Sequence, residues 1–194
     1  MQIGIPLTLA ISYLIGSVPF GVIFSKTMKG KDPRLAGSRN IGFTNVLRVV
    51  GAGPAILTLC GDVGKGALAA YLGKYYQSPE VGEASALFAI LGHCYPIFLR
   101  LQGGKAVATS FGALALLYPL EGVLTFTVWV ATVLWSRFVS LGALVAFAFL
   151  PLIMAWFHPR WNTILFSLAI AILVYLRHRE NISLLLSNKE KKSF

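Results

Sequence analysis

The hydrophobic residues of this 194-residue chain fall into long runs separated by short polar segments. The runs cover residues 4 to 25, 54 to 76, 83 to 99, 106 to 119, 122 to 135, 138 to 157 and 161 to 176. A helix that crosses a bilayer needs about 20 mostly apolar residues, so a chain of this length with short connections has room for six or seven spans. The pattern predicts an all-α polytopic integral membrane protein of about seven transmembrane helices, folded as a single domain over residues 1 to 194.

The composition agrees with a membrane protein and narrows its chemistry. Hydrophobic residues make up 56% of the chain and charged residues 12%, and the mean hydropathy of +0.72 is far from that of a soluble domain. The two cysteines, Cys60 and Cys94, lie in apolar runs and lack the spacing of a zinc site. We therefore expect neither a disulfide framework nor a bound metal.

Positive charge is concentrated in alternate loops, which predicts an orientation. Fourteen of the seventeen Lys and Arg residues fall in residues 26 to 53, in residues 100 to 105, at position 137 and from residue 177 onward. Because cytoplasmic loops are rich in Lys and Arg, this distribution predicts an outside N-terminus and a cytoplasmic C-terminus. The net charge is +10, but a membrane protein with this distribution has no soluble basic surface that could follow a nucleic acid backbone. Nucleic acid is therefore disfavoured as a partner.

Residues 37 to 48 form a polar, glycine-punctuated segment that is typical of an anion-binding loop. Its two glycines permit unusual backbone conformations, four short side chains offer hydrogen bonds, and two arginines add fixed charge. These residues are Gly37, Ser38, Arg39, Asn40, Gly42, Thr44, Asn45 and Arg48. The alternative interpretation of this stretch by itself is an ordinary basic cytoplasmic loop.

A second polar segment, Gly103-Gly104-Lys105, precedes the apolar run at 106 to 119. Glycine-rich backbone that leads into a helix N-terminus directs amide hydrogens at one place, and Lys105 adds a charge there, with Thr109 one turn inside the helix. The spacing is not that of a Walker A motif, so a nucleotide is not indicated. We expect a second anion-binding segment here.

Ionisable residues also occur inside two of the runs. Asp62 and Lys65 are three residues apart, share one face of a helix and can pair, either as a structural ion pair or as part of a site. His93 stands late in the next run, where a helix-end hydrogen bond is the alternative to a role in the site. Arg137, His178 and Asn181 follow at other cytoplasmic ends.

The predicted topology brings all these polar groups to one side of the membrane. Charge that only oriented the protein would not need the accompanying Gly, Asn, Ser and Thr residues that can bind phosphate oxygens. The sequence therefore predicts a site for one or two phosphates at the cytoplasmic interface, open to lipid.

Seven short motifs, read in order, resemble one family. They are Gly16-Ser17, the pattern Gly-Ser-x-Asn-x-Gly-x-Thr-Asn-x-x-Arg at 37 to 48, Asp62-x-x-Lys-Gly66, Gly92-His-x-x-Pro96, Gly103-Gly-Lys-x-Val-Ala-Thr109, Arg137-x-x-Ser-Leu141 and His178-Arg-x-Asn-Ile182. Together they resemble the bacterial membrane-integral glycerol-3-phosphate acyltransferases that use acyl-phosphate. Departures from the family pattern occur at Arg39, where glycine is usual, and at Gln102, Ala106, Leu184 and Asn188.

The resemblance implies a specific reaction. An acyl chain would pass from acyl-phosphate to the 1-hydroxyl of glycerol-3-phosphate, giving 1-acyl-glycerol-3-phosphate (lysophosphatidic acid) and inorganic phosphate, the first step of phospholipid synthesis. It also implies a multi-pass protein of the bacterial cytoplasmic (inner) membrane with its active site on the cytoplasmic face. We expect a monomer that contacts membrane lipids and needs no cofactor and no acyl carrier protein.

Site roles are assigned from the same resemblance, and the division of these residues between the two phosphates is our own inference. The acyl-phosphate would be bound by Ser38, Arg39, Asn40, Gly103, Gly104 and Lys105. The catalytic residues would be Ser38, Arg39, Asn40, Lys105 and His178. Glycerol-3-phosphate would be bound by Thr44, Asn45, Arg48, His178 and Asn181, and the site would be braced by Asp62, Lys65, His93 and Arg137, with Gly37, Gly42 and Thr109 completing the binding segments.

Two questions stay open at the level of sequence. The base for the attacking hydroxyl is either His178 or an oxygen of the acyl-phosphate, and we favour the substrate oxygen because no carboxylate plainly orients a histidine. The function itself has two rivals, a transporter of an organic phosphate and a structural membrane protein. The His-x-x-x-x-Asp pair of acyl-thioester enzymes is absent, because Phe98, Thr163 and Ser183 stand five residues after the three histidines.

Overall fold

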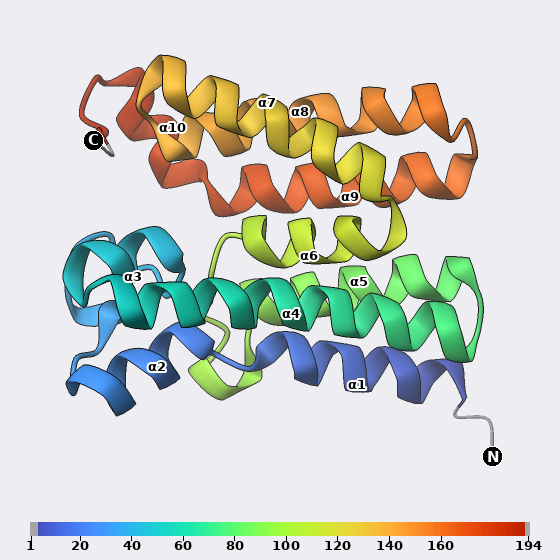
Figure 1. Cartoon of the computed structure of the whole chain (residues 1–194), viewed down its shortest axis with the longest axis horizontal. Helices are drawn as coiled ribbons and strands as arrows, with labels where there is room; N and C mark the ends of the chain where they lie inside the picture. The colour runs from blue at the N-terminus through green and yellow to red at the C-terminus, as the bar shows by residue number, and fades with distance from the viewer. Residues whose placement is uncertain (1–3, 193–194) are drawn as a thin grey trace.

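The computed structural model describes residues 4–192, and all regular secondary structure in that range is helical (Figure 1). The α-helices are α1 Ile5–Ser17, α2 Phe20–Lys29, α3 Phe43–Val49, α4 Ala52–Tyr76, α5 Pro79–Cys94, α6 Val107–Leu117, α7 Pro119–Ser136, α8 Val139–Phe157, α9 Trp161–Arg177 and α10 Arg179–Leu186. Two 3-10 turns, η1 Pro33–Leu35 and η2 Ile97–Leu99, lie in the connections. The expectation of an all-α chain is confirmed over the described residues.

The helices differ in whether they are long enough to cross a bilayer. Among the described residues, five spans qualify by length and composition: α1 together with α2, α4, α5 with η2, α7 and α8. A sixth qualifies if α9 and α10, bent by 61° at their junction, are taken as one broken span. Helix α6 has 11 residues and is about 16 Å long, too short to cross by itself. The predicted number of about seven spans and the orientation of the termini stay predictions.

Small residues let the helices approach closely. A Cβ added to Gly16 of α1 would lie 2.1 Å from the carbonyl oxygen of Ala89 in α5, and one added to Gly66 of α4 would lie 2.0 Å from that of Thr109 in α6. Such contacts are how helices associate in lipid, where hydrophobicity gives no driving force between them. Helix α6 therefore packs directly on α4, and α1 on α5.

Helix α6 lies between two helix groups (Figure 1). One group contains α1, α4 and α5, and the other contains α7, α8 and α9. The shared apolar core includes Ile90, Leu114, Phe147 and Ile170, which are all fully buried. Helices α2, α3 and α10 gather at one end of the molecule, beside the start of α8 (Figure 1). The polar segments singled out in the sequence therefore do meet at one end.

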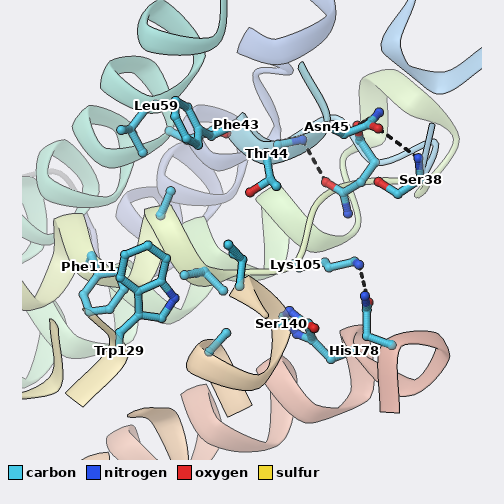
Figure 2. Close-up of a pocket in the computed structure, with 18 of the residues that line it drawn as sticks. Ser38, Phe43, Thr44, Asn45, Leu59, Lys105, Phe111, Trp129, Ser140 and His178 are labelled. Atoms are coloured by element: carbon cyan, nitrogen blue, oxygen red, sulfur yellow. Dashed lines mark hydrogen bonds between the residues drawn. The ribbon is translucent and has the colours of Figure 1, made fainter. Parts of the chain in front are cut away.

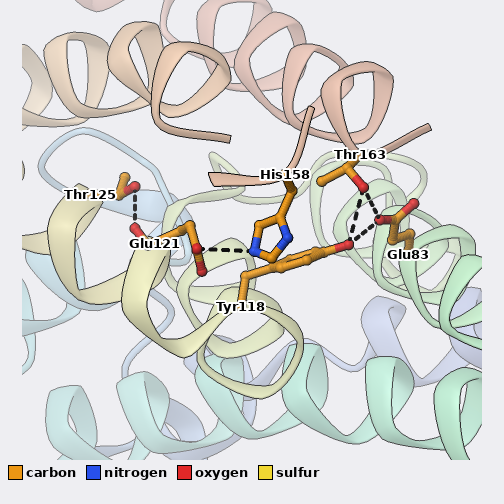
Figure 3. Close-up of polar contacts among 6 residues, drawn as sticks. All are labelled: Glu83, Tyr118, Glu121, Thr125, His158 and Thr163. Atoms are coloured by element: carbon orange, nitrogen blue, oxygen red, sulfur yellow. Dashed lines mark hydrogen bonds and ion pairs between the residues drawn. The ribbon is translucent and has the colours of Figure 1, made fainter. Parts of the chain in front are cut away.

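The opposite end is closed by a network of hydrogen bonds (Figure 3). Tyr118 and Thr163 both donate to the buried carboxylate of Glu83, the latter over 3.1 Å. The His158 Nε2 and Glu121 Oε1 atoms are 3.0 Å apart. These contacts tie together the ends of α5, α6, α7, α8 and α9. Each of the two buried carboxylates therefore has a polar partner within the protein.

Candidate active site

A cavity of about 420 Å³ lies where the loop before α3 faces the starts of α6 and α8 and the C-terminal segment (Figure 2). Its polar lining contains Ser38, Asn40, Thr44, Asn45, Arg48, Asp62, His93, Lys105, Ser140, His178, Asn181, Glu190 and Lys191. Its apolar lining contains Leu59, Val63, Val107, Ala108, Phe111, Phe126, Trp129 and Ala143, among others. One cavity therefore joins a cationic polar end to an apolar end.

Asn45 holds the loop before α3 in shape. Its side chain is buried, and its Oδ1 accepts the amide hydrogen of Ser38 over 2.9 Å. Its Nδ2 donates to the carbonyls of Pro33 and Asn40 at 2.9 and 2.8 Å. Gly37, at φ 62°, is so close that an added Cβ would lie 2.3 Å from Asn45 Oδ1. The asparagine therefore organises the loop, with its polar atoms already used inside the protein.

The other loop residues divide into two groups. Ser38, Asn40, Thr44 and Arg48 line the cavity, and the Asn40 side chain also accepts the Gly42 amide hydrogen at 2.8 Å, which closes a tight turn. Arg39 is exposed and is not among the lining residues. Its φ of 57° lies in the left-handed region that favours glycine. The backbone conformation thus accounts for the glycine that the family resemblance leads one to expect at this position.

Asp62, Lys65 and His93 form a buried cluster beside the cavity. The Lys65 Nζ atom is 2.7 Å from Asp62 Oδ1, and His93 Nδ1 is 3.4 Å from the same oxygen. Lys65 also donates to the Val18 carbonyl at 3.0 Å, at the break between α1 and α2 where Pro19 has no amide hydrogen. The Phe20 amide also donates to this carbonyl, at 3.1 Å, so the lysine adds a second hydrogen bond at the helix break while the aspartate balances its charge.

The glycine pair at 103 and 104 owes its composition to close packing. The Gly103 and Gly104 amides donate to the carbonyls of Cys94 and His93 at 3.2 and 2.9 Å, and their own carbonyls accept from the Arg177 guanidinium. An added Cβ at Gly104 would lie 2.0 Å from His93 Nε2. This differs from the expectation that these amides are free for phosphate. Their partners are within the protein, and the free amides nearby are those of the first turn of α6.

Lys105 directly follows the glycine pair, and its side chain lines the cavity. Its Nζ donates to Asn181 Oδ1 of α10, and Asn181 Nδ2 donates to Glu190 Oε1 over 2.7 Å. Ser140, at the start of α8, donates to the same carboxylate oxygen over 3.0 Å. Burial lowers the pKa of Lys105, and the nearby Glu190 opposes that shift. The C-terminal segment is thereby tied to α8 and α10 beside the lysine.

His178 follows the last residue of α9 and faces the same cavity. Its Nδ1 lies 2.8 Å from the Val174 carbonyl, which only accepts, so Nδ1 carries the hydrogen and Nε2 keeps its lone pair. Burial lowers the pKa of His178 to about 4. The imidazole is therefore neutral near pH 7 and suited to accept a hydrogen bond from a hydroxyl group.

Several expectations fall outside the cavity. Arg137 caps α7 at φ 65° with an exposed side chain, and Thr109 is buried against α4, and neither is a lining residue. Conversely, Ser140, Arg177 and Glu190 were not predicted as site residues. Ser140 and Arg177 lie within or next to the recognised motifs, whereas Glu190 reaches the site only because the chain turns back after α10.

A Gly104→Ala variant is expected to disturb the site more than a change at an open glycine. The new Cβ would force His93 or the 103–105 segment to move, and a misplacement of about 1 Å can cost roughly a hundredfold in rate. Gly64→Ala is the matched control, because a Cβ there meets nothing within 4 Å. Activity and thermal unfolding in detergent check this. Equal behaviour of the two variants would contradict the packing account.

His178 is expected to make stability fall as the pH drops. Its pKa in the folded protein is about 4 and its ordinary value 6.5, so between these values the unfolded chain binds more protons. Folding stability therefore decreases from pH 6.5 towards pH 4. The apparent Tm of a His178→Gln variant, measured over this range, is expected to decline less steeply than that of the wild type. Parallel declines would show that His178 is not buried as a neutral group.

Comparison with known proteins gives the family. A profile described as glycerol-3-phosphate acyltransferase matches residues 6–188. The chain is 42% identical over 182 residues to a glycerol-3-phosphate acyltransferase of Carboxydothermus hydrogenoformans, covering 94% of this chain and 93% of that protein. It is 43% identical over 186 residues to glycerol-3-phosphate acyltransferase 2 of Moorella thermoacetica, covering 96% of each.

Solved structures agree with the sequence relatives. The chain is similar to a crystal structure of PlsY (YgiH), an integral membrane glycerol 3-phosphate acyltransferase, in its glycerol 3-phosphate form, with a TM-score of 0.92 and 34% identity over 97% of this chain and 94% of that chain. The lysophosphatidic acid form of the same protein gives a TM-score of 0.90 with 32% identity. The fold is therefore that of an integral membrane protein of the acyltransferase class. The chain belongs to the glycerol-3-phosphate acyltransferase family.

Proposed function

We propose that this protein transfers an acyl chain from acyl-phosphate to the 1-hydroxyl of glycerol-3-phosphate. The observation that carries the proposal is the single cavity whose polar end holds Arg48, Lys105 and His178 and whose apolar end holds Phe111 and Trp129. An acyl-phosphate has the same division, a phosphate joined to a hydrocarbon chain. The acceptor, glycerol-3-phosphate, is inferred from the names of the family relatives given above.

The reaction needs positioning and charge more than a strong nucleophile. The oxygen of the 1-hydroxyl forms an ester bond to the acyl carbon, the bond between that carbon and the phosphate oxygen breaks, and the electron pair leaves with the phosphate. Lys105 stabilises the negative charge on that phosphate, which is the kind of interaction that lowers an acyl-transfer barrier most. Metal ions and acyl carrier protein have no part in this scheme.

The proton of the attacking hydroxyl is assigned to the departing phosphate. A group with a pKa near 4 is a weak base at neutral pH, so His178 holds and orients the hydroxyl through Nε2. Ser38 and the first-turn amides of α6 bind the donor phosphate, and Thr44, Arg48 and Asn181 bind the glycerol-3-phosphate. Asp62, Lys65 and His93 brace these elements, and Asn45 shapes the loop.

The donor is tested by direct substitution of one activated acyl group for another. Purified protein in detergent is supplied with labelled glycerol-3-phosphate and either palmitoyl-phosphate or palmitoyl-coenzyme A, in the presence of a metal chelator. Lysophosphatidic acid is expected from the acyl-phosphate alone. Product from the thioester at a comparable rate, or none from the acyl-phosphate, would overturn the proposed donor.

We also propose that the end containing α2, α3 and α10 faces the cytoplasm and that the N-terminus lies outside. This orientation accounts for the clustering of Lys and Arg at that end. With Cys60 replaced by serine, a Glu80→Cys variant is expected to react with a membrane-impermeant maleimide in intact cells. A Ser187→Cys variant is expected to react only after permeabilisation. The reverse pattern would invert the topology.

A further inference from the structure

A second cavity adjoins the apolar end of the first. It has a volume of about 330 Å³ and is lined by Val63, Phe111, Ala115, Pro119, Gly122, Val123 and Phe126. Three of these residues, Val63, Phe111 and Phe126, also line the first cavity. The two spaces are therefore neighbours with a shared wall, and the second extends towards the turn between α6 and α7, away from Lys105.

The shared wall is built mainly of aromatic rings. The rings of Phe111 and Phe126 meet edge to face with centroids 5.5 Å apart, and Phe126 also stacks on Trp129 at 5.5 Å. Aromatic pairs of this kind add about 0.5–1.5 kcal/mol beyond simple burial. The contact between the two rings thus separates the two cavities, and breaking it costs little free energy.

The two rings differ in freedom. Phe111 packs against the fully buried Phe147 at 5.3 Å, and its helix is fixed to α4 because a Cβ at Gly112 would lie 1.9 Å from the Val63 carbonyl oxygen. Phe126, on α7, is 48% exposed and lines both cavities. We therefore expect the Phe126 ring to move when the two cavities join, while Phe111 and Val63 stay in place.

We propose that Phe126, closing against Phe111, determines which acyl chain lengths this enzyme uses. This inference rests on the function proposed above. Chains that end at the ring pair fit the first cavity alone. Longer chains displace the Phe126 ring and place their last carbons in the second cavity, whose walls beyond the rings are small side chains such as Ala115 and Val123.

The alternative occupant of the second cavity is the tail of a bilayer lipid. Ala115, Pro119 and Val123 are exposed in the protein, so the tail of a membrane lipid has the same access as the end of a donor chain. Both occupants have the same apolar chemistry. They differ in one respect, because only the donor chain is connected through the first cavity to the phosphate at Lys105.

The test compares lauroyl- and stearoyl-phosphate as donors for three variants in detergent without phospholipid. Phe126→Ala is expected to raise the stearoyl-to-lauroyl ratio of kcat/KM about tenfold, the scale on which apolar pockets discriminate. Ala115→Phe, which fills the second cavity, is expected to lower the ratio by a similar factor with little effect on lauroyl-phosphate. Leu120→Ala, on the exposed start of α7 and outside both cavities, is the control and leaves the ratio unchanged.

Thermal unfolding with each donor and no glycerol-3-phosphate gives a second readout that needs no turnover. Stearoyl-phosphate is expected to raise the apparent Tm of Phe126→Ala more than that of Ala115→Phe. Unchanged ratios and equal Tm shifts in both variants would overturn the proposed role of Phe126 in chain-length selection, even if lysophosphatidic acid forms normally. Effects that arise only in phospholipid vesicles and are equal for both donors would assign the second cavity to a bilayer lipid instead. Failure of the proposed function is separate, since no variant, nor the wild type, would then form product.

Discussion

A Lys105→Ala variant is expected to lose about 10²- to 10³-fold in kcat with acyl-phosphate, the usual effect of removing one group that stabilises developing charge. Lys105 is the cation just before the start of α6, and its Nζ atom is held by Asn181. Removing the ammonium leaves the departing phosphate without that charge. It also leaves Asn181 Oδ1 without its donor, so some weakening of substrate binding is expected as well.

Two further variants separate charge from geometry at this position. Lys105→Arg keeps the charge but not the compact ammonium, so partial activity is expected. Lys189→Ala removes a positive charge from the same C-terminal segment, but this exposed residue does not line the cavity, so near wild-type activity is expected. If Lys105→Ala and Lys189→Ala had the same kinetics, general positive charge rather than a positioned group would explain catalysis.

An Asp62→Ala variant is expected to lose about 3–5 kcal/mol of stability, because it leaves the Lys65 ammonium buried without its counter-charge. Asp62 and Lys65 are both almost fully buried, with 2.7 Å between Oδ1 and Nζ. His93 approaches the same carboxylate, so its orientation against Gly104 is expected to loosen too. The measurement is the apparent Tm in detergent together with protease resistance.

The matched control replaces both members of the pair. An Asp62→Leu and Lys65→Met double variant has no buried charge, and replacing a whole buried pair with apolar groups is often close to neutral. Its apparent Tm is expected to exceed that of Asp62→Ala, although the Val18 carbonyl then lacks its lysine partner. A double variant as unstable as the single one would show that the helix break, and not charge balance, is what Lys65 mainly serves.

The approximate positions of the helices could be read from the sequence because hydrophobic runs and the polar punctuation between them are local signals. Each predicted run coincides with helix in the structure, within a few residues at most ends. The start of α6 at Val107 agrees with the predicted run at 106 to 119, whereas the contacts that hold the segment before it were not predictable because they are tertiary. The chain from Tyr95 to Ala106 is held there by the backbone of α5 and by Arg177.

The residue types at the site were also predictable, but their contacts were not. Glycine, asparagine and lysine in short motifs indicate anion binding, yet the same residues serve internal packing. Asn45 uses its amide on the loop, and Gly104 is small because His93 lies against it. Glu190 carried no local signal at all, because its place beside Ser140 is set by the turn after α10.

The most direct measurement of the central claim is the balance of products in a defined system. Purified wild-type protein receives only acyl-phosphate and glycerol-3-phosphate, and inorganic phosphate and lysophosphatidic acid are quantified in the same reaction. Equimolar release of the two, dependent on both substrates, is the predicted result. Phosphate released without lysophosphatidic acid, or unaffected by omitting glycerol-3-phosphate, would contradict acyl transfer at this site.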